Sequence, residues 1–316
     1  MNNSELIELR NEVDRYGFSF YLANQMNLNF VPRSFANWQH GWYWGSVNIN
    51  ELDLILGYPL KKNYNIPTIV QNAEIKKAFI AKGFREVIAG GIPFSYIKKS
   101  KSTRVEDSII VILPHSLEYT NFSKNDDFND LILSIKALSK IFTKVSCLVY
   151  YDDFRKKTFN KFFKNTEIDI ISGARSNSKN ALSNIRSIFD KYEYAVSNCI
   201  GSAILYAMFC ECKVSLLEPF FNYSYDFWKT DPYLRDNKNL IDLMEYHHSK
   251  KYLKIKYGFL FNENPKDAEI NYEMAKDLIG IDYKLELEKI KTILGWGISS
   301  KPKVLLRLLH RKLVGI

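Results

Sequence analysis

The sequence predicts an α/β protein of two Rossmann-like domains that face a cleft, the first of them abbreviated. Three observations support this prediction. Short, continuously apolar runs alternate five times with helical segments between residues 108 and 219, a pattern typical of a parallel sheet covered on both faces. A shorter version of the same alternation occupies residues 68–89. The chain has 316 residues, which is more than one hydrophobic core usually supports.

The region between residues 108 and 219 has the clearer pattern. Its predicted strands are short and apolar, and its predicted helices carry apolar residues at helical spacing. Ligands of parallel sheets bind beyond the carboxyl ends of the strands, so we expect a ligand site in the loops that follow the strands. We expect strands at 108–113, 145–150, 168–171, 194–197 and 214–217, and helices at 126–142, 154–163, 179–190 and 202–210.

Three regions follow from this pattern. We expect an acceptor-side α/β domain at 1–100, with a strand at 68–70, a helix at 73–82 and a strand at 86–89. The polar, charged segment 98–107 is the predicted linker to a nucleotide-donor-binding domain at 105–235. A helical extension at 236–316 completes the chain and includes a basic amphipathic helix at 301–314.

The charge of the chain limits its partners. A formal net charge of +9 suits nucleic acid, anionic lipid or phosphorylated substrates. The lysines are scattered, and zinc-finger and RNA-binding motifs are absent from the sequence, so no nucleic-acid partner is expected. The basic helix at 301–314 is expected to lie on an anionic membrane surface, although it could instead pack across the domain cleft.

Cysteine usage and the N-terminus indicate a cellular compartment. The 4 cysteines lie in apolar stretches without a CxxC pair, which favours free buried thiols over zinc ligands or disulfides. The N-terminus lacks a basic region followed by an apolar run, and no apolar run approaches the roughly 20 residues of a membrane span. We therefore expect a cytoplasmic protein, peripheral at the inner face of the cytoplasmic membrane.

A histidine flanked by aromatic residues is the first candidate for chemistry. His40 precedes Gly41, which allows a sharp turn or close approach to a ligand. Histidine serves as a general base near neutral pH, and here it would take a proton from an acceptor hydroxyl. Trp38, Trp42 and Trp44 could stack on sugar rings. The alternative is a hydrogen-bonded histidine inside an aromatic core.

Two loops at strand ends are candidates for holding a phosphate. His115 and Ser116 follow the first strand of the second sheet. Asn198, Gly201 and Ser202 stand where the fourth strand passes into a helix, whose N-terminal N–H groups and dipole favour an anion. An ordinary turn and simple helix capping are the alternatives.

Three further groups of polar residues lie after predicted strands or on a charged helix. Glu218 ends the fifth strand and could accept hydrogen bonds from a ribose or remain a solvated turn residue. The pair Asp152 and Asp153 is not expected to bind metal, because adjacent acidic side chains point apart. The pair His247 and His248 is expected at the surface of a charged helix. No metal or other cofactor is therefore expected.

Several of these segments resemble parts of GT-B glycosyltransferases. Residues 65–94 look like the end of the N-terminal domain of that family. The run from Trp38 to Gly41 is similar to a motif of bacterial CDP-glycerol transferases and capsule-type transferases. Residues 197–207 resemble the helix start that holds the donor phosphate. Residues 113–116 look like the His-Pro loop of transferases that use CMP-activated sugars, in reversed order.

The resemblance implies a function and a role for each residue. His40 would act as the base or orient the acceptor, near Trp38, Gly41 and Trp42. The donor would be held by His115, Ser116, Asn198, Gly201, Ser202 and Glu218. Tyr206 stands where the family commonly has an acidic ribose ligand. The implied reaction moves a sugar from a nucleotide-activated donor to a lipid-linked or surface-polysaccharide acceptor, without a metal; the alternatives are polyol-phosphate transfer from a CDP donor and a non-catalytic glycan-binding or scaffold module.

Overall fold

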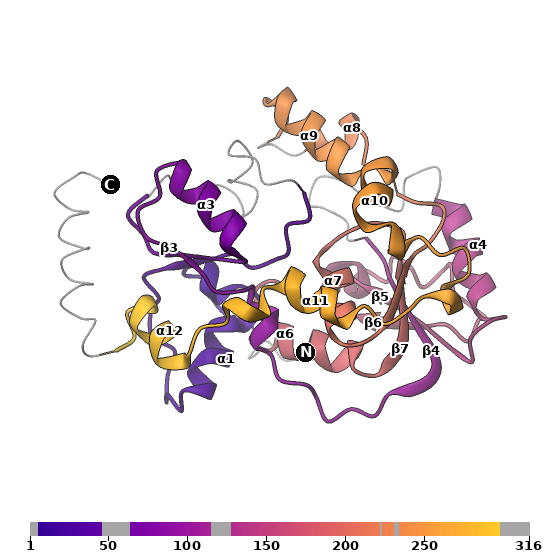
Figure 1. Ribbon diagram of the computed structural model, residues 1–316. Coiled ribbons are helices and arrows are strands. Elements are labelled where there is room, and N and C mark those ends of the chain that lie inside the picture. Colours follow the sequence, from indigo (N-terminus) through magenta and orange to yellow (C-terminus); the bar gives the residue numbers. More distant parts are fainter. Residues whose placement is uncertain (1–5, 46–63, 115–127, 222, 231–233, 298–316) are drawn as a thin grey trace.

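The computed structural model describes residues 6–45, 64–114, 128–221, 223–230 and 234–297 (Figure 1). Two parallel sheets organise this part of the chain, a sheet of three strands in the first half and one of five strands in the second. The α/β class predicted from the alternation of apolar runs is confirmed.

The larger sheet has the strand order β6-β5-β4-β7-β8, with every neighbouring pair parallel. β4 is the central strand, and its residues 108–112 are buried because helices cover both faces of the sheet. The strands are β4 (Val105–Ile112), β5 (Lys144–Val149), β6 (Asp169–Ser172), β7 (Tyr192–Ser197) and β8 (Lys213–Leu216). The helices that alternate with them are α4 (Phe128–Leu138), α5 (Tyr151–Arg155), α6 (Ala181–Phe189) and α7 (Ser202–Phe209).

The chain reverses its direction of winding between β4 and β7. β5 and β6 lie on one side of β4, whereas β7 and β8 lie on the other. Ile112 and Ser197 are register partners at the carboxyl ends of the two strands, and Ser197 Oγ donates a hydrogen bond to the Ile112 carbonyl at 2.8 Å. A crevice opens at such a switch point, since the loops leave the sheet in opposite directions.

The smaller sheet has the order β1-β2-β3 and is also parallel. Its strands are short, which agrees with an abbreviated first unit. The helix α3 begins where Asn72 caps it by accepting a hydrogen bond from the Ile75 N–H. The elements of this half are the 3-10 helix η2 (Glu12–Gly17), α1 (Phe18–Gln25), β1 (Asn37–Trp38), β2 (Thr68–Val70), α3 (Ala73–Ala81), β3 (Val87–Ala89) and the 3-10 helix η4 (Pro93–Tyr96).

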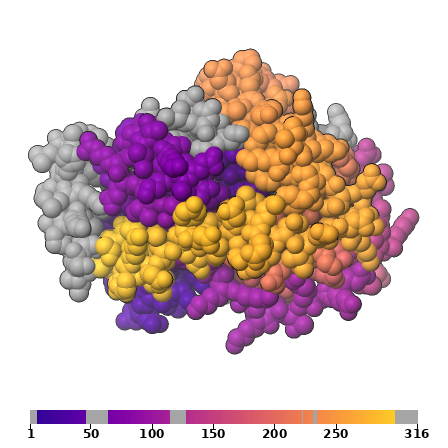
Figure 2. Space-filling view, viewed as in Figure 1, coloured from indigo at the N-terminus to yellow at the C-terminus, as the bar shows by residue number. Residues whose placement is uncertain are grey.

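The remaining elements lead from the second half back to the first. They are α8 (Tyr225–Trp228), α9 (Lys238–His248), α10 (Lys250–Tyr257), the 3-10 helices η6 (Gly258–Leu260) and η7 (Pro265–Asp267), α11 (Tyr272–Ile279), η8 (Ile281–Tyr283) and α12 (Leu287–Leu294). Figure 2 shows this segment, in orange and yellow, lying across both halves. α11 packs on α7, with the rings of Tyr272 and Phe209 5.8 Å apart. Beyond it, the Phe35 N–H donates to the Leu294 carbonyl at 3.0 Å.

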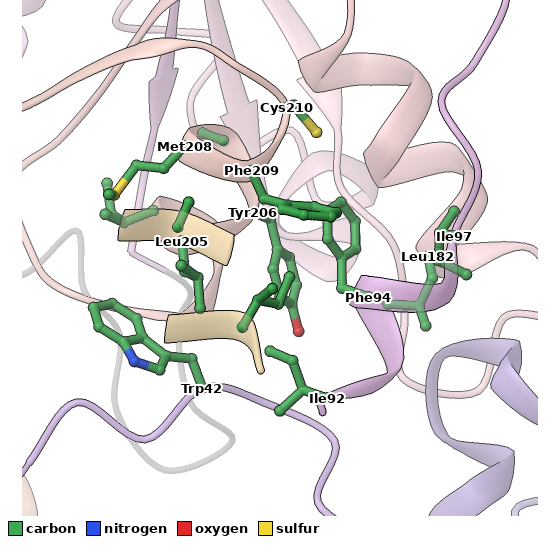
Figure 3. Packing of buried hydrophobic residues seen from close by; sticks show 14 of the residues in the cluster. Trp42, Ile92, Phe94, Ile97, Leu182, Leu205, Tyr206, Met208, Phe209 and Cys210 are labelled. Carbon is green, nitrogen blue, oxygen red and sulfur yellow. The ribbon is translucent and has the colours of Figure 1, made fainter. Parts of the chain in front are cut away.

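One hydrophobic cluster joins the two halves (Figure 3). At its centre the ring of Phe94 stacks on that of Tyr206, with centroids 4.0 Å apart and planes inclined by 11°. Phe94 follows β3, whereas Tyr206 belongs to α7 of the second half. The relative position of the two sheets is therefore fixed by packed side chains that exclude water.

One predicted helix is wrong. Residues 154–163 were expected to form a helix, but α5 ends at Arg155 and turns follow. Lys157 adopts a left-handed backbone conformation with φ of 55°, which interrupts a helix. The buried rings of Phe159 and Phe163 pack against the sheet, so tertiary packing overrides the helical spacing of this segment.

Two other predictions from the sequence meet the structure here. All 4 cysteines are free and buried, as expected. The basic helix predicted at 301–314 lies outside the described residues. Among the residues that are described, no helix combines the length and the apolar composition required to span a bilayer.

The junction of α11 with the first half provides a test of this packing. Gly280 has a φ of 79°, and a Cβ there would lie 2.2 Å from the Gln71 carbonyl oxygen. Gly83 has a φ of 102°, but no atom of the described residues would lie within 4 Å of a Cβ there. We expect Gly83→Ala to lower the free energy of unfolding by about 1–2 kcal/mol through backbone strain alone. Gly280→Ala adds a clash and should cost about 2–5 kcal/mol, as measured by chemical denaturation. Equal losses in the two variants would contradict the close approach of α11 to β2.

Candidate functional site

A cavity of about 450 Å³ lies between the two halves, at the carboxyl ends of β4 and β7. Its size is in the range of ligand-binding pockets. The first half lines it with Tyr16, His40, Gly41 and Trp44. The second half lines it with the residues that follow β4 and β7 and with side chains of α8 and α9. The switch point of the larger sheet therefore opens into a space that faces the predicted histidine.

A carboxylate pairs with the candidate base. His40 Nδ1 lies 3.5 Å from Glu12 Oε2, which is within ion-pair distance. Burial tends to raise the pKa of the Glu12 carboxyl, but its contacts with His40 and Arg15 outweigh this effect and leave the pKa below its usual value. Glu12 therefore stays ionised and can stabilise a protonated imidazole. Because Nδ1 faces Glu12, Nε2 is the nitrogen available to a substrate.

The first turn of α7 holds the loop that carries His40. The Trp42 N–H donates to Ser202 Oγ at 2.9 Å, and the Tyr206 hydroxyl donates to the His40 carbonyl at 3.3 Å. The Ser202 oxygen is thus already used as an acceptor within the protein. Tyr206, where the resembled family commonly has an acidic ribose ligand, supports the backbone of His40 instead.

The start of α7 is open toward the cavity. Gly201, Ser202 and Ala203 line the cavity, and no side chain caps the helix. Among the residues that the structure describes, no atom would lie within 4 Å of a Cβ on Gly201, so none of them fills the space in front of the helix. The N–H groups of a first helical turn have no partner within the helix, and the helix dipole places partial positive charge there. This end of the cavity can accept an anion.

Several predicted residues do not line the cavity. Trp38 is fully buried in the first half, where its Nε1 donates to the Gly91 carbonyl at 2.8 Å. Asn198 is buried and donates from Nδ2 to the Pro219 carbonyl at 3.3 Å. Glu218 is exposed and pairs with Lys250. Trp42 packs edge-on against Tyr257 behind the cavity, and Trp44 is the tryptophan of this loop that reaches it.

The loop after β4 is described only in part. Leu113 and Pro114 line the cavity. His115 and Ser116, which were predicted to hold the donor phosphate, lie outside the described residues.

The prediction that His247 and His248 lie at the surface is wrong. Only 3% of His247 and 4% of His248 is exposed, because both stand on the inner face of α9. His248 lines the cavity beside Tyr223, Phe227, Trp228 and Met244. The charged residues of α9 suggested a solvated helix, whereas its two histidines face an aromatic cluster contributed by distant segments.

Glu12 was also missed by the sequence analysis. It lies 28 positions before His40 in a 3-10 helix, and no motif connects the two residues. Only the fold brings them together. In the described part of the chain, no group of three or more His, Cys, Asp or Glu side chains is arranged as a metal site.

Comparison with known proteins gives no family assignment. No protein-family model and no curated protein matches the chain. Among solved structures, the UDP-GlcNAc 2-epimerase of Methanocaldococcus jannaschii is 14% identical over 73% of this chain and 62% of its own, with a TM-score of 0.37. A variant of S. aureus TarM, in complex with Fondaparinux, alpha-GlcNAc-glycerol and UDP, is 12% identical over 87% of this chain and 52% of its own, with a TM-score of 0.36. Another structure of TarM is 14% identical over 77% and 43%, with a TM-score of 0.31. The chain spans less than two thirds of each of these proteins, and a likeness at this level carries no conclusion about function.

The buried His248 makes stability depend on pH. Burial lowers its pKa from 6.5 to about 4. The unfolded chain therefore binds the proton more readily than the folded protein, so the stabilisation is complete above pH 6.5 and is lost as the pH falls toward 4. We expect a loss of about 3 kcal/mol from this group over that interval. Urea denaturation between pH 7 and pH 4 should show a shallower pH dependence for His248→Gln than for the original chain. Identical pH slopes would contradict the burial of a neutral imidazole.

Proposed function

We propose that this chain is a glycosyltransferase of the GT-B type, which moves a sugar from a nucleotide-activated donor to a hydroxyl of an acceptor glycan. The observation that carries the proposal is that two features meet in one cavity between two α/β units, each with a sheet of parallel strands. A carboxylate-supported histidine enters from the first half, and the uncapped start of α7 enters from the second.

Each feature supplies one part of a transfer reaction. His40 Nε2 takes the proton of the acceptor hydroxyl while that oxygen forms a bond to the anomeric carbon of the donor. The bond between this carbon and the donor phosphate oxygen breaks, and its electron pair leaves with the nucleotide. The first turn of α7 stabilises the negative charge that develops on the leaving phosphate. Glu12 stabilises the imidazolium that results.

The composition of the cavity wall supports the role of α7 in stabilising the phosphate. Among the described residues that line it, none is Lys or Arg. The positive potential available to a phosphate in this part of the structure therefore comes from the N–H groups and dipole of α7. In the proposed reaction these groups meet the charge of the leaving phosphate without a metal ion.

The acceptor and the location belong to the same proposal. A lipid-linked or surface-polysaccharide acceptor would be met at the inner face of the cytoplasmic membrane. The net charge of +9 and the basic segment 301–314 support attraction to an anionic membrane surface.

Substitution of the base tests the mechanism. We expect His40→Ala to lower turnover by about 10²–10⁴, the range typical of general-base catalysis, while nucleotide affinity is kept. Glu12→Gln should reduce turnover less, because the imidazole remains. Turnover is measured as transfer of sugar from radiolabelled nucleotide sugars to membrane extract. Nucleotide affinity is measured by calorimetry. Full turnover in His40→Ala would remove His40 from the mechanism.

Nucleotide binding is tested separately. Isothermal titration with CMP, CDP, UDP, GDP and ADP should identify a preferred nucleotide, and binding of none would favour a non-catalytic module. Gly201→Val places a side chain in the open space before α7 and should weaken that binding at least about tenfold, since it blocks the N–H groups. Gly258→Val is the matched control, because a Cβ there also meets no described atom within 4 Å and Gly258 does not line the cavity. Equal affinities of the two variants would argue against a phosphate at α7.

A further inference from the structure

The cavity has two chemically different ends. One end holds His40 with its partner Glu12 and the start of α7. The other end is aromatic and is formed by α8, α9 and the loop before Tyr225, together with Trp44 of the first half. The proposed transfer reaction uses the end with His40 and α7. It assigns no function to the aromatic end.

The aromatic end surrounds one imidazole. The ring centroid of His248 lies 4.9 Å from that of Trp44, 4.9 Å from that of Trp228 and 4.8 Å from that of Tyr223. The planes of Trp44 and His248 are inclined by 87°, an edge-to-face arrangement. Flat aromatic surfaces of this kind provide a rigid wall for a ring-shaped ligand.

The hydrogen bonding of His248 defines what its free nitrogen can do. Nδ1 lies 2.7 Å from the Met244 carbonyl oxygen, which can only accept, so Nδ1 carries the proton. In the neutral imidazole Nε2 is then an acceptor. Burial lowers the pKa of His248 to about 4, so the ring keeps this neutral form at physiological pH. No described residue bonds to Nε2, and His248 lines the cavity.

The charge and position of the aromatic end limit the class of ligand that it can bind. No Lys or Arg lies among the described residues that line the cavity, and the start of α7 lies at its other end, so the aromatic end favours an uncharged ligand. Trp44 stands four positions after His40 in the same loop, which α9 and α10 hold in place. Trp44 Nε1 donates to the His247 carbonyl at 3.3 Å, and the Tyr257 hydroxyl donates to the Trp44 carbonyl at 3.0 Å. A ring bound beside Trp44 therefore lies in the same cavity as the proposed base.

We propose that the aromatic end is the acceptor subsite, which binds an uncharged sugar ring against Trp44 and Trp228 and accepts a hydrogen bond from one of its hydroxyls at His248 Nε2. This inference rests on the proposed function and names the part of the cavity that selects the acceptor. His248 acts as a specificity residue and not as a catalytic one.

Saturation-transfer NMR on the full chain tests the proposal with methyl glycosides of glucose, galactose, mannose and N-acetylglucosamine as probes. We expect at least one glycoside to bind the original chain and to bind His248→Phe about five- to tenfold more weakly, because Phe keeps the ring but not the acceptor. His248→Gln, which keeps an acceptor, should stay within about twofold of the original affinity. Tyr246→Phe, on the exposed side of α9, is the matched control and should leave the glycoside affinity unchanged.

Other outcomes would overturn the subsite without touching the proposed transferase. These are nucleotide binding with no glycoside binding, an unchanged glycoside affinity in His248→Phe, a preference for choline chloride over every glycoside, or displacement of the bound glycoside by inorganic phosphate. Weaker nucleotide binding in His248→Phe would assign the aromatic end to the nucleobase instead. Absence of all nucleotide binding, by contrast, would count against the transferase itself.

Discussion

The contact between the first turn of α7 and the loop that carries His40 is the constraint on which the site depends. Ser202 accepts a hydrogen bond from the Trp42 backbone, and Tyr206 donates one to the His40 carbonyl. Behind these bonds, Phe94 stacks on Tyr206. The same helix therefore has its N-terminus open to the cavity and fixes the position of His40. Neither half contains both functions, so the cavity is a property of their association.

The sequence was sufficient for the elements of the larger sheet. Its strands are short apolar runs because both faces are covered, and this environment leaves a strong signal in the sequence. The helix predicted around Phe159 is wrong because the spacing of its aromatic residues reflects the burial of separate rings between turns, and not one face of a helix. Local pattern predicts an element only where local and tertiary requirements agree.

The site was predicted less completely than the fold. Of the predicted residues, His40, Gly201 and Ser202 line the cavity, and each sits at a turn or helix start where backbone geometry leaves a recognisable pattern. Trp38 carried the same signal as Trp44, and only the register of β1 decides which ring is buried in the core. Glu12 reaches His40, and His248 reaches the cavity, through contacts between distant segments that no local pattern encodes.

The return of the chain to the first half has a consequence for biosynthesis. The Gln71 side chain and the Ile92 N–H donate to the carbonyls of Leu278 and Ile279, and the Phe35 N–H donates to that of Leu294. These carbonyls emerge from the ribosome well after residues 35–92, which bond to them, have been made. The larger sheet, in contrast, is complete in sequence by Leu216. During translation the second half can therefore assemble first and serve as the template on which the N-terminal half is finished.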